Sequence, residues 1–173
     1  GIIPEPMFDE IAPGKPIASY LDSRKEDLPA LVSLAFTASA AHEKDLPQFV
    51  AGLGSEDPVT RYWAIQGCLN LGKSASKTTA SLVALLDDPY SANRVAAAEA
   101  LFGLGHEKQA GNVLVAELDR APNEDAVLNV ICVLTRTDAL GSIPDDWVRK
   151  ALKENKAGEY VKRLAVRLDQ ERK

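Results

Sequence analysis

The amino-acid sequence predicts an all-α fold in which short helices repeat along the chain. Apolar residues recur at helical spacing over most of the sequence, and no stretch keeps the period-two alternation of a half-buried strand. A pattern of residues also returns after 33 positions, as in helical-repeat proteins. The chain has 173 residues, of which 46% are hydrophobic and 26% charged, as is usual for a globular protein with a sizeable core.

Charge and hydropathy limit the classes of partner. The formal net charge is −5, which argues against a nucleic acid as the partner. No apolar run reaches the roughly 18 residues that a membrane span needs. The first residues lack the basic and apolar segments of a signal peptide, and we expect the chain to be a piece of a longer protein.

The N-terminal segment 1–26 differs from the remainder because it is rich in proline. Prolines resist helix formation and favour an extended chain. We therefore expect an irregular N-terminal arm over residues 1–26, with at most a short helical turn at Met7–Ile11, leading into a repeat domain over 27–173. The prolines are Pro4, Pro6, Pro13 and Pro16.

Beyond the arm, the apolar pattern predicts short helices separated by turn residues. Asp57-Pro58 and Asp88-Pro89 each place a capping residue and a proline near a helix start. Gly72 and Gly105 follow helix ends, where a left-handed residue is favoured. The expected helices are 28–42, 45–53, 58–71, 75–86, 91–104, 107–120, 123–137, 144–155 and 158–171.

The recurrence is clearest between 61–72 and 94–105, where Arg, Ala, Leu and Gly return at matching places. Each segment carries one buried-type helix face with spacing i, i+3, i+4, i+7. A further shift keeps the face but loses the terminal glycine. The three faces are Ala64, Gly67, Cys68, Leu71; Ala97, Ala100, Leu101, Leu104; and Val130, Val133, Leu134, Thr137.

The helices between these segments repeat as well, so the predicted unit is two antiparallel helices of about 33 residues. Small residues at Gly67, Ala97 and Ala100 are expected to let helix axes approach closely. Each unit needs its neighbours to cover its apolar surface. The intervening faces are Leu46, Phe49, Val50, Leu53; Thr79, Leu82, Val83, Leu86; and Leu114, Val115, Leu118.

The C-terminal part of the chain has the opposite charge to the remainder. Residues 147–173 hold nine Lys or Arg against four Asp or Glu, which is +5, whereas residues 1–146 hold eleven against twenty-one, which is −10. A polar outer face is what the end of a helical repeat array needs for solubility. We interpret the last helix as such a cap, with a docking face for an acidic partner as the alternative.

The Asp-Pro turn, the following Arg, the Ala three residues later and the closing Leu-Gly resemble HEAT-like repeats. The string Asp57-Pro58-Val59-Thr60-Arg61-Tyr62-Trp63-Ala64 more closely resembles the C-terminal HEAT-like region of bacterial type I, formylglycine-dependent sulfatases. The upstream Leu28-Pro29-Ala30-Leu31 helix and the lead-in Ile3-Pro4-Glu5-Pro6-Met7-Phe8 fit the same context. The resemblance implies a right-handed α-solenoid of about four to five helix pairs.

The resemblance also implies that this chain carries no catalytic residue of the sulfatase. In that family a Cys or Ser in a Cys/Ser-x-Pro-x-Arg string becomes the formylglycine, and a calcium ion lies in the catalytic domain. Cys132 to Arg136 has the same spacing, but Leu134 replaces the proline. We therefore expect no cofactor here and a periplasmic or extracellular parent enzyme. The expected partner is the missing N-terminal catalytic domain or another protein.

Two other functions stay open: a stand-alone HEAT-repeat module for protein–protein interaction, and a relative of the lyases or chaperones whose HEAT-like repeats handle bilin chromophores. The residues chosen as a possible interface are Tyr62, Trp63 and Trp147, because the repeat itself does not demand aromatic side chains there. Tyr62 and Trp63 are expected to pack against the first helix, or to form the surface on which the arm or a missing domain docks.

Most other polar residues have a structural interpretation. Arg61 and Arg94 recur at one repeat position and are expected to bond neighbouring aspartates or turn carbonyls. We expect no metal site, because the two histidines and the paired carboxylates lack metal-ligand spacing. Cys68 and Cys132 are interpreted as small buried hydrophobes, with a disulfide left open. The histidines are His42 and His106, and the carboxylate pairs are Asp87-Asp88, Glu124-Asp125 and Asp145-Asp146.

Overall fold

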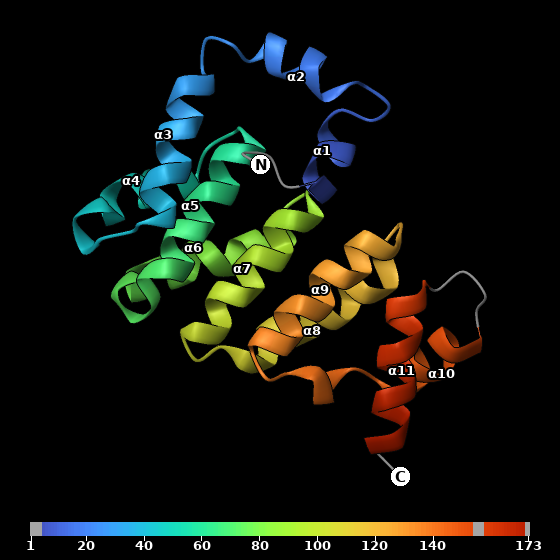
Figure 1. The fold of residues 1–173 in the computed structure, drawn as a ribbon. Coiled ribbons are helices and arrows are strands. Elements are labelled where there is room, and N and C mark those ends of the chain that lie inside the picture. Colours follow the sequence, from blue (N-terminus) through green and yellow to red (C-terminus); the bar gives the residue numbers. More distant parts are fainter. Residues whose placement is uncertain (1–4, 154–157, 172–173) are drawn as a thin grey trace. The chain divides into compact units, whose positions relative to one another are not determined.

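The computed structural model describes residues 5–153 and 158–171, and every regular element within these ranges is a helix (Figure 1). The predicted all-α class is therefore confirmed. Contacts between residues divide the chain into two compact units, Gly1–Ala110 (unit 1) and Gly111–Lys173 (unit 2). The division falls inside one helix, and each unit is described by itself.

The N-terminal arm is not irregular, because it contains two short helices, α1 (Glu5–Ile11) and α2 (Ile17–Ser23). The prolines delimit these helices instead of preventing them. Pro6 lies in the first turn of α1, where no backbone amide is needed, and Pro16 is the N-terminal cap of α2. The arm belongs to unit 1 by its contacts, while the domain boundary predicted from composition after residue 26 stays a prediction.

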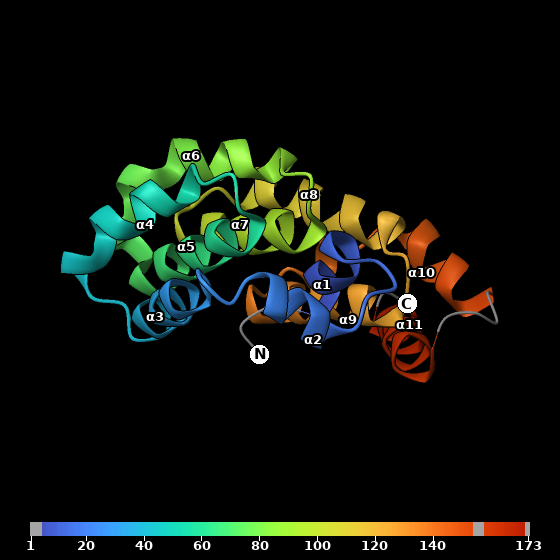
Figure 2. The ribbon, with the colours of Figure 1, turned by 90° about the horizontal axis from the view of Figure 1, so that it is seen from above.

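Unit 1 is built in two layers of helices that follow the arm (Figure 2). One layer holds α3 (Leu28–Ser39), α5 (Pro58–Leu71) and α7 (Ser91–Gly103), and the second holds α4 (Leu46–Leu53) and α6 (Thr79–Ala84). Helix α5 contacts α3, α4 and α7, so it forms the centre of the unit. The bounds of α5 coincide with those predicted, because Asp57 caps its first turn and Gly72 ends it with a φ of 54°.

One predicted helix, at 75–86, is interrupted. In this range α6 lies between two 3-10 helices, η2 (Gly72–Thr78) and η3 (Leu85–Asp87). A further 3-10 helix, η1 (Glu43–Asp45), precedes α4. In this region the hydroxyls of Thr78 and Thr79 each donate to the carbonyl three residues earlier, at 2.7 Å. Such local side-chain bonds compete with continuous α-helix formation.

The layers approach closely through glycine, as the sequence predicted for Gly67. A β-carbon at Gly67 would lie 2.5 Å from the ring of Phe49, so α4 and α5 meet where no side chain fits. A β-carbon at Gly52 would likewise lie 2.8 Å from that of Ala64. The predicted face of α4 is corrected at Val50, which is 49% exposed, because the helix turns Gly52 toward α5 instead.

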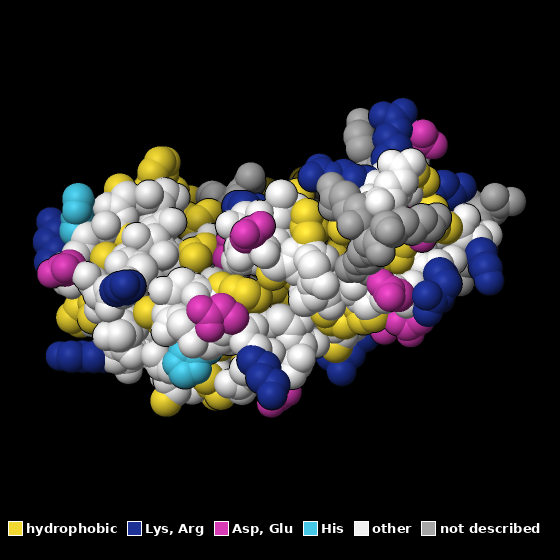
Figure 3. Space-filling view, turned by 90° about the horizontal axis from the view of Figure 1, so that it is seen from below, with side chains coloured by type: hydrophobic (Ala, Val, Ile, Leu, Met, Phe, Trp, Pro, Cys, Tyr) yellow, Lys and Arg dark blue, Asp and Glu magenta, His cyan; other side chains and the backbone are white. Residues whose placement is uncertain are grey.

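Unit 2 contains the end of α8 (Glu107–Arg120), then α9 (Glu124–Arg136), α10 (Asp145–Lys153) and α11 (Glu159–Glu171), with a 3-10 turn η4 at Leu140–Ser142. Helices α10 and α11 pack together, and α11 also contacts α9. Lys and Arg side chains gather over α10 and α11 (Figure 3). This agrees with the positive charge of the C-terminal segment.

Two helices end in the same hydrogen-bonded motif, centred on Gly105 (φ 86°) after α7 and on Asp138 (φ 56°) after α9. In each, the amide that follows the left-handed residue donates to the carbonyl five residues earlier, at 2.9 Å and 2.7 Å respectively. The two positions are separated by one period of the repeat. The repeat therefore keeps its turn at Asp138, although the glycine is gone.

Candidate functional site

The aromatic pair of the candidate interface packs against an apolar cluster in unit 1. The rings of Tyr62 and Trp63 meet edge to face, with centroids 5.4 Å apart. Both side chains are half-buried and pack, together with Ile11, against four buried residues from four helices. These residues are Met7 of α1, Leu31 of α3, Val59 of α5 and Ala92 of α7.

This cluster joins the N-terminal arm to the helices that follow it. Met7 is completely buried, so the arm seals the cluster instead of extending away from it. The carboxylate of Glu10 accepts a hydrogen bond from the backbone amide of Ser91 at 3.0 Å. Ser91 is the first residue of α7, and a carboxylate at a helix N-terminus is electrostatically favourable. Tyr62 and Trp63 thus lie at a junction with α3, and the arm takes part in the same junction.

Arg24 ties the far end of the arm to the start of α5. Its guanidinium donates to the Asp57 carboxylate at 2.8 Å, to the Asp27 carboxylate at 2.8 Å and to the Tyr20 hydroxyl at 2.7 Å. The hydrogen bond with Asp27 is the main cause of a raised Arg24 pKa. Burial opposes ionisation of Asp57, but hydrogen bonds from Thr60 and Arg24 outweigh it and lower the Asp57 pKa.

The repeated arginines make the contacts that the sequence predicted. Arg61 donates to the carbonyls six and five residues before it, at 2.8 and 2.9 Å. Arg94 does the same with the carbonyls six and five residues before it, at 2.7 and 2.9 Å. Arg61 also forms a two-pronged ion pair with Asp88, at 2.7 and 3.2 Å. Each arginine therefore binds the carbonyls of the turn that precedes its own helix, and Arg61 also binds Asp88 in the turn that precedes α7.

Asp88 is a buried junction of polar groups. Its carboxylate also accepts hydrogen bonds from the amide of Tyr90 at 2.9 Å and the side chain of Asn93 at 3.2 Å. The Asn93 amide donates a second bond to the Pro58 carbonyl at 3.3 Å, which links the starts of α5 and α7. Asn93 is fully buried and its side-chain oxygen has no partner. The pair of Arg61 and Asp88 therefore has a structural role, because the two charges neutralise each other and both side chains are largely buried.

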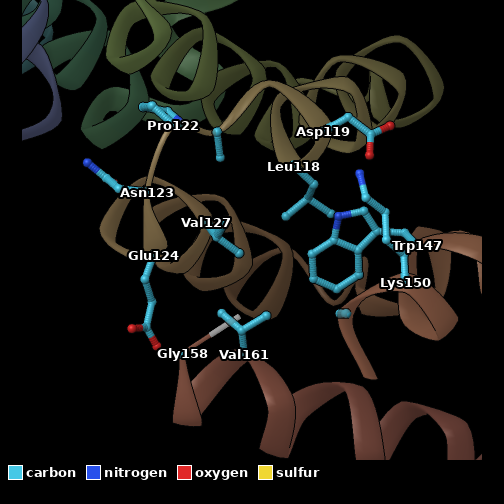
Figure 4. Close-up of a pocket in the computed structure, with 12 residues that line it drawn as sticks. Leu118, Asp119, Pro122, Asn123, Glu124, Val127, Trp147, Lys150, Gly158 and Val161 are labelled. Carbon is cyan, nitrogen blue, oxygen red and sulfur yellow. The ribbon is translucent and has the colours of Figure 1, made fainter. Parts of the chain in front are cut away.

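The third aromatic residue of the candidate interface, Trp147, lies in unit 2 beside a small cavity of about 220 Å³. Trp147 is 9% exposed, and its ring faces the same space as Leu118, Val127 and Val161 (Figure 4). Trp147 therefore belongs to unit 2, whereas Tyr62 and Trp63 belong to unit 1. Its main role in the described chain is to anchor α10 on the apolar side chains around it.

The polar groups at this cavity are few. Lys150 and Asp119 lie at one side, and Glu124 points toward Gly158 at the other (Figure 4). The Glu124 carboxylate lies directly against Gly158, in the space that a β-carbon there would occupy. One Glu124 oxygen is buried without a hydrogen-bond partner. The charged and amide side chains that line this cavity are Asp119, Asn123, Glu124 and Lys150.

The remaining reactive side chains are separate. Burial raises the pKa of the Cys68 thiol, and a hydrogen bond with Thr78 offsets only part of this effect. Cys132 is exposed, which corrects the prediction that both cysteines are buried, and both thiols are free. His42 and His106 are exposed, as their solvated interpretation requires. Among the residues that the structure describes, no group of three or more His, Cys, Asp or Glu could hold a metal ion.

Sequence reasoning missed several residues that build the junction, above all Met7, Glu10, Arg24 and Asn93. Arg24 and Asp57 are separated by one period of the repeat, so that period was a signal that could have paired them. Met7 is the only methionine of the chain. Its apolar character within a proline-rich segment was a signal that the segment packs on something.

Comparisons with known proteins give no family for this chain. No protein-family model matches the sequence, and no curated protein is significantly similar to it. In the part of the chain that the structure describes, no helix is both long and apolar enough to cross a membrane.

Proposed function

We propose that this chain is a non-catalytic HEAT-like module, a right-handed α-solenoid, that acts as a structural and interaction scaffold in a bacterial sulfatase. One observation carries the proposal. The three segments that resemble the sulfatase C-terminal region meet in a single cluster. The lead-in contributes Met7, the upstream helix contributes Leu31, and the Arg-Tyr-Trp-Ala string contributes its two aromatic rings.

The repeated arginine contacts support the solenoid part of the proposal. Arg61 and Arg94 close equivalent turns one repeat apart, and Arg61 bonds the following turn through Asp88. This pattern is what a stack of similar helix pairs requires, since each pair must hold its neighbour. The buried joint would keep the stack rigid.

The mechanism of such a scaffold is mechanical. The arm contacts the repeats at three places along its length, through the packing of Met7 and the hydrogen bonds of Glu10 and Arg24. Any domain that precedes the arm would therefore be held close to the repeats instead of swinging on a free linker. The parent reaction would be hydrolysis of a sulfate ester outside the cytoplasm, with calcium bound only in the catalytic domain.

The test is to read the gene upstream of this segment and to assay the chain with 4-nitrophenyl sulfate. We expect a Cys/Ser-x-Pro-x-Arg string upstream and no hydrolysis by the chain alone. A different upstream domain, or a start codon directly before the segment, would remove the sulfatase assignment. Hydrolysis by the purified chain would contradict the non-catalytic role.

The alternative is a stand-alone HEAT-repeat module for protein–protein interaction. The arginine contacts support it equally, because they concern the repeats and not the parent protein. The gene sequence upstream of the segment distinguishes the two functions. A reading frame that begins with the arm would favour the stand-alone module, and its protein partner would then be sought by affinity capture.

A further inference from the structure

The two helices of the N-terminal arm are joined to each other by side-chain contacts. The rings of Phe8 in α1 and Tyr20 in α2 meet edge to face, with centroids 5.9 Å apart. The guanidinium of Arg24, which directly follows α2, lies over the Tyr20 ring at 5.7 Å from its centroid and also donates to the Tyr20 hydroxyl. Because these contacts link α1 to α2, we expect the arm to move as one body.

Few buried groups hold the arm to the repeats. Among the described side chains of residues 5–23, only Met7 and Ala12 are buried, and α2 contributes none. Helix α7, which α1 contacts, has nine buried residues. Each arm helix has seven residues, fewer than the roughly 12–15 that an isolated helix needs to be stable in water. The arm is therefore expected to open at a lower free energy than the helices beneath it.

The repeats beneath the arm have supports of their own. Helix α5 contacts α3, α4 and α7. Asp57 caps the first turn of α5 through the amide of Thr60 at 2.8 Å, a bond that does not involve the arm. The ion pair of Arg61 with Asp88 joins α5 to the turn before α7. Opening of the arm would thus leave these helices folded and expose the apolar surface that they share.

Helix α1 binds this surface in the manner of an amphipathic helix. Met7 and Ile11 are four residues apart, on one face of α1, and both pack in the apolar cluster. Beside the cluster, the carboxylate of Glu10 accepts the amide of Ser91 at the N-terminus of α7, at 3.0 Å. The pattern is thus apolar anchors at i and i+4 with a carboxylate at i+3. We call the covered surface the arm site: Leu31, Val59, Tyr62, Trp63 and Ala92.

We propose that α1 is an internal ligand of the arm site, and that an amphipathic helix of a partner protein takes its place when the arm opens. The partner helix carries large apolar side chains at i and i+4 and a carboxylate at i+3. The carboxylate is favoured because the N-terminus of α7 combines a partial positive charge with backbone amide donors. The contact is autoinhibitory, since the apparent affinity for the partner falls with the fraction of molecules whose site is open.

Binding of the partner would also change what the arm holds. In the closed state the arm keeps any preceding domain close to the repeats, and displacement of α1 by the partner helix releases that domain. The two events are coupled because α1 and the partner helix occupy the same surface. The proposal depends on unit 1 alone and is independent of the sulfatase assignment.

Amide hydrogen exchange of the wild-type chain tests whether the arm opens by itself. The amide of Ala12 donates to the carbonyl of Phe8 at 3.0 Å, so its exchange reports on the arm. We expect this amide to exchange at least roughly 100-fold faster than the amides in the middle of α5. Exchange of both at the same rate would mean that the arm opens only when the unit unfolds, and would overturn the proposal.

Binding of a helix in trans tests the arm site itself. The probe is a fluorescein-labelled peptide of residues 5–23, titrated with the full chain and followed by fluorescence anisotropy. Met7→Asp in the chain releases its own arm, so this variant should bind the peptide at least roughly tenfold more tightly than the wild type. Ile17→Asp is the matched control, because Ile17 is 53% exposed on α2, and it should bind like the wild type. A peptide that itself carries Met7→Asp should not bind.

Glu10→Lys is a second releasing variant that leaves the apolar cluster intact, since Glu10 is exposed and acts through its carboxylate. It should strengthen binding of the peptide about fivefold. Circular dichroism verifies that all variants are folded. The proposal is overturned if neither Met7→Asp nor Glu10→Lys binds the peptide more tightly than the wild type, or if the altered peptide binds equally well. None of these outcomes bears on the gene reading that tests the sulfatase assignment.

Discussion

Replacing Asp138 by glycine is expected to stabilise the protein. Asp138 ends α9 with a φ of 56°, a conformation that costs a side chain with a β-carbon roughly 1–2 kcal/mol, and less for aspartate than for most residues. Its carboxylate also lies at the negative end of the helix, which costs about 0.3–1 kcal/mol. Glycine removes both effects but gives the unfolded chain more freedom, worth about 0.4–1 kcal/mol. The expected net gain in the free energy of unfolding is about 1 kcal/mol.

The assay is urea unfolding followed by circular dichroism at neutral pH, supported by thermal melts. A gain of this size should raise the melting temperature by roughly 2–4 °C if the chain unfolds as one unit. Asp138→Asn is the matched control for charge, because asparagine keeps the β-carbon and also tolerates left-handed φ. High salt should shrink the gain of Asp138→Asn and leave most of the additional gain of Asp138→Gly.

The reverse substitution at the equivalent position completes the test. Gly105 has a φ of 86°, and a β-carbon there would have no atom within 4 Å, so only the backbone conformation opposes alanine. Gly105→Ala should therefore destabilise the protein by about 1 kcal/mol. The reasoning would be refuted if Asp138→Gly were no more stable than Asp138→Asn, or if Gly105→Ala were neutral.

Three further predictions concern the joints of unit 1. Gly67→Ala should destabilise the protein by about 1–3 kcal/mol in thermal melts, because the new β-carbon would lie 2.5 Å from the ring of Phe49. Gly103→Ala is the control, because a β-carbon there has no neighbour within 4 Å, and it should be neutral or stabilising. Arg61→Met should cost about 3–5 kcal/mol in urea unfolding, because it leaves a buried carboxylate without its cation; a loss below about 1 kcal/mol would contradict this. Asp57→Asn should lower the free energy of unfolding at pH 7. The difference in free energy of unfolding between the variant and the wild type should shrink as the pH falls below about 4, because the pKa of Asp57 is lowered in the folded state and its ion pair with Arg24 is lost on protonation. A difference that stays constant between about pH 7 and pH 3 would refute this.

Much of the helical structure could be predicted because its signals are local. The start of α5 follows from Asp57 accepting the amide of Thr60, a bond that spans three residues. The turns closed by Arg61 and Arg94 are equally short, and their recurrence at the repeat period made them visible in the sequence. Interactions of such short range depend little on the remainder of the fold.

The face that a residue presents was harder to predict. Cys132 lies in an apolar run, yet Val130 and Leu134, two positions away on either side, are buried while Cys132 is exposed. Two residues along a helix correspond to a rotation of about 200°, so a continuous apolar run always places some members outside. Val50 was misassigned for a related reason, since the glycine at position 52 defines the contact side of α4.

The sequence by itself determined the all-α class, most helix bounds, the repeated arginine turns and the close approach at Gly67. Only the tertiary structure showed that the proline-rich arm folds back and buries Met7 against Tyr62 and Trp63, and that Trp147 belongs to a separate cluster. The physical reason is the range of the forces involved. Hydrogen bonds and backbone conformation are settled within a few residues, whereas burial depends on which distant segments meet, and nothing in a local pattern records that choice.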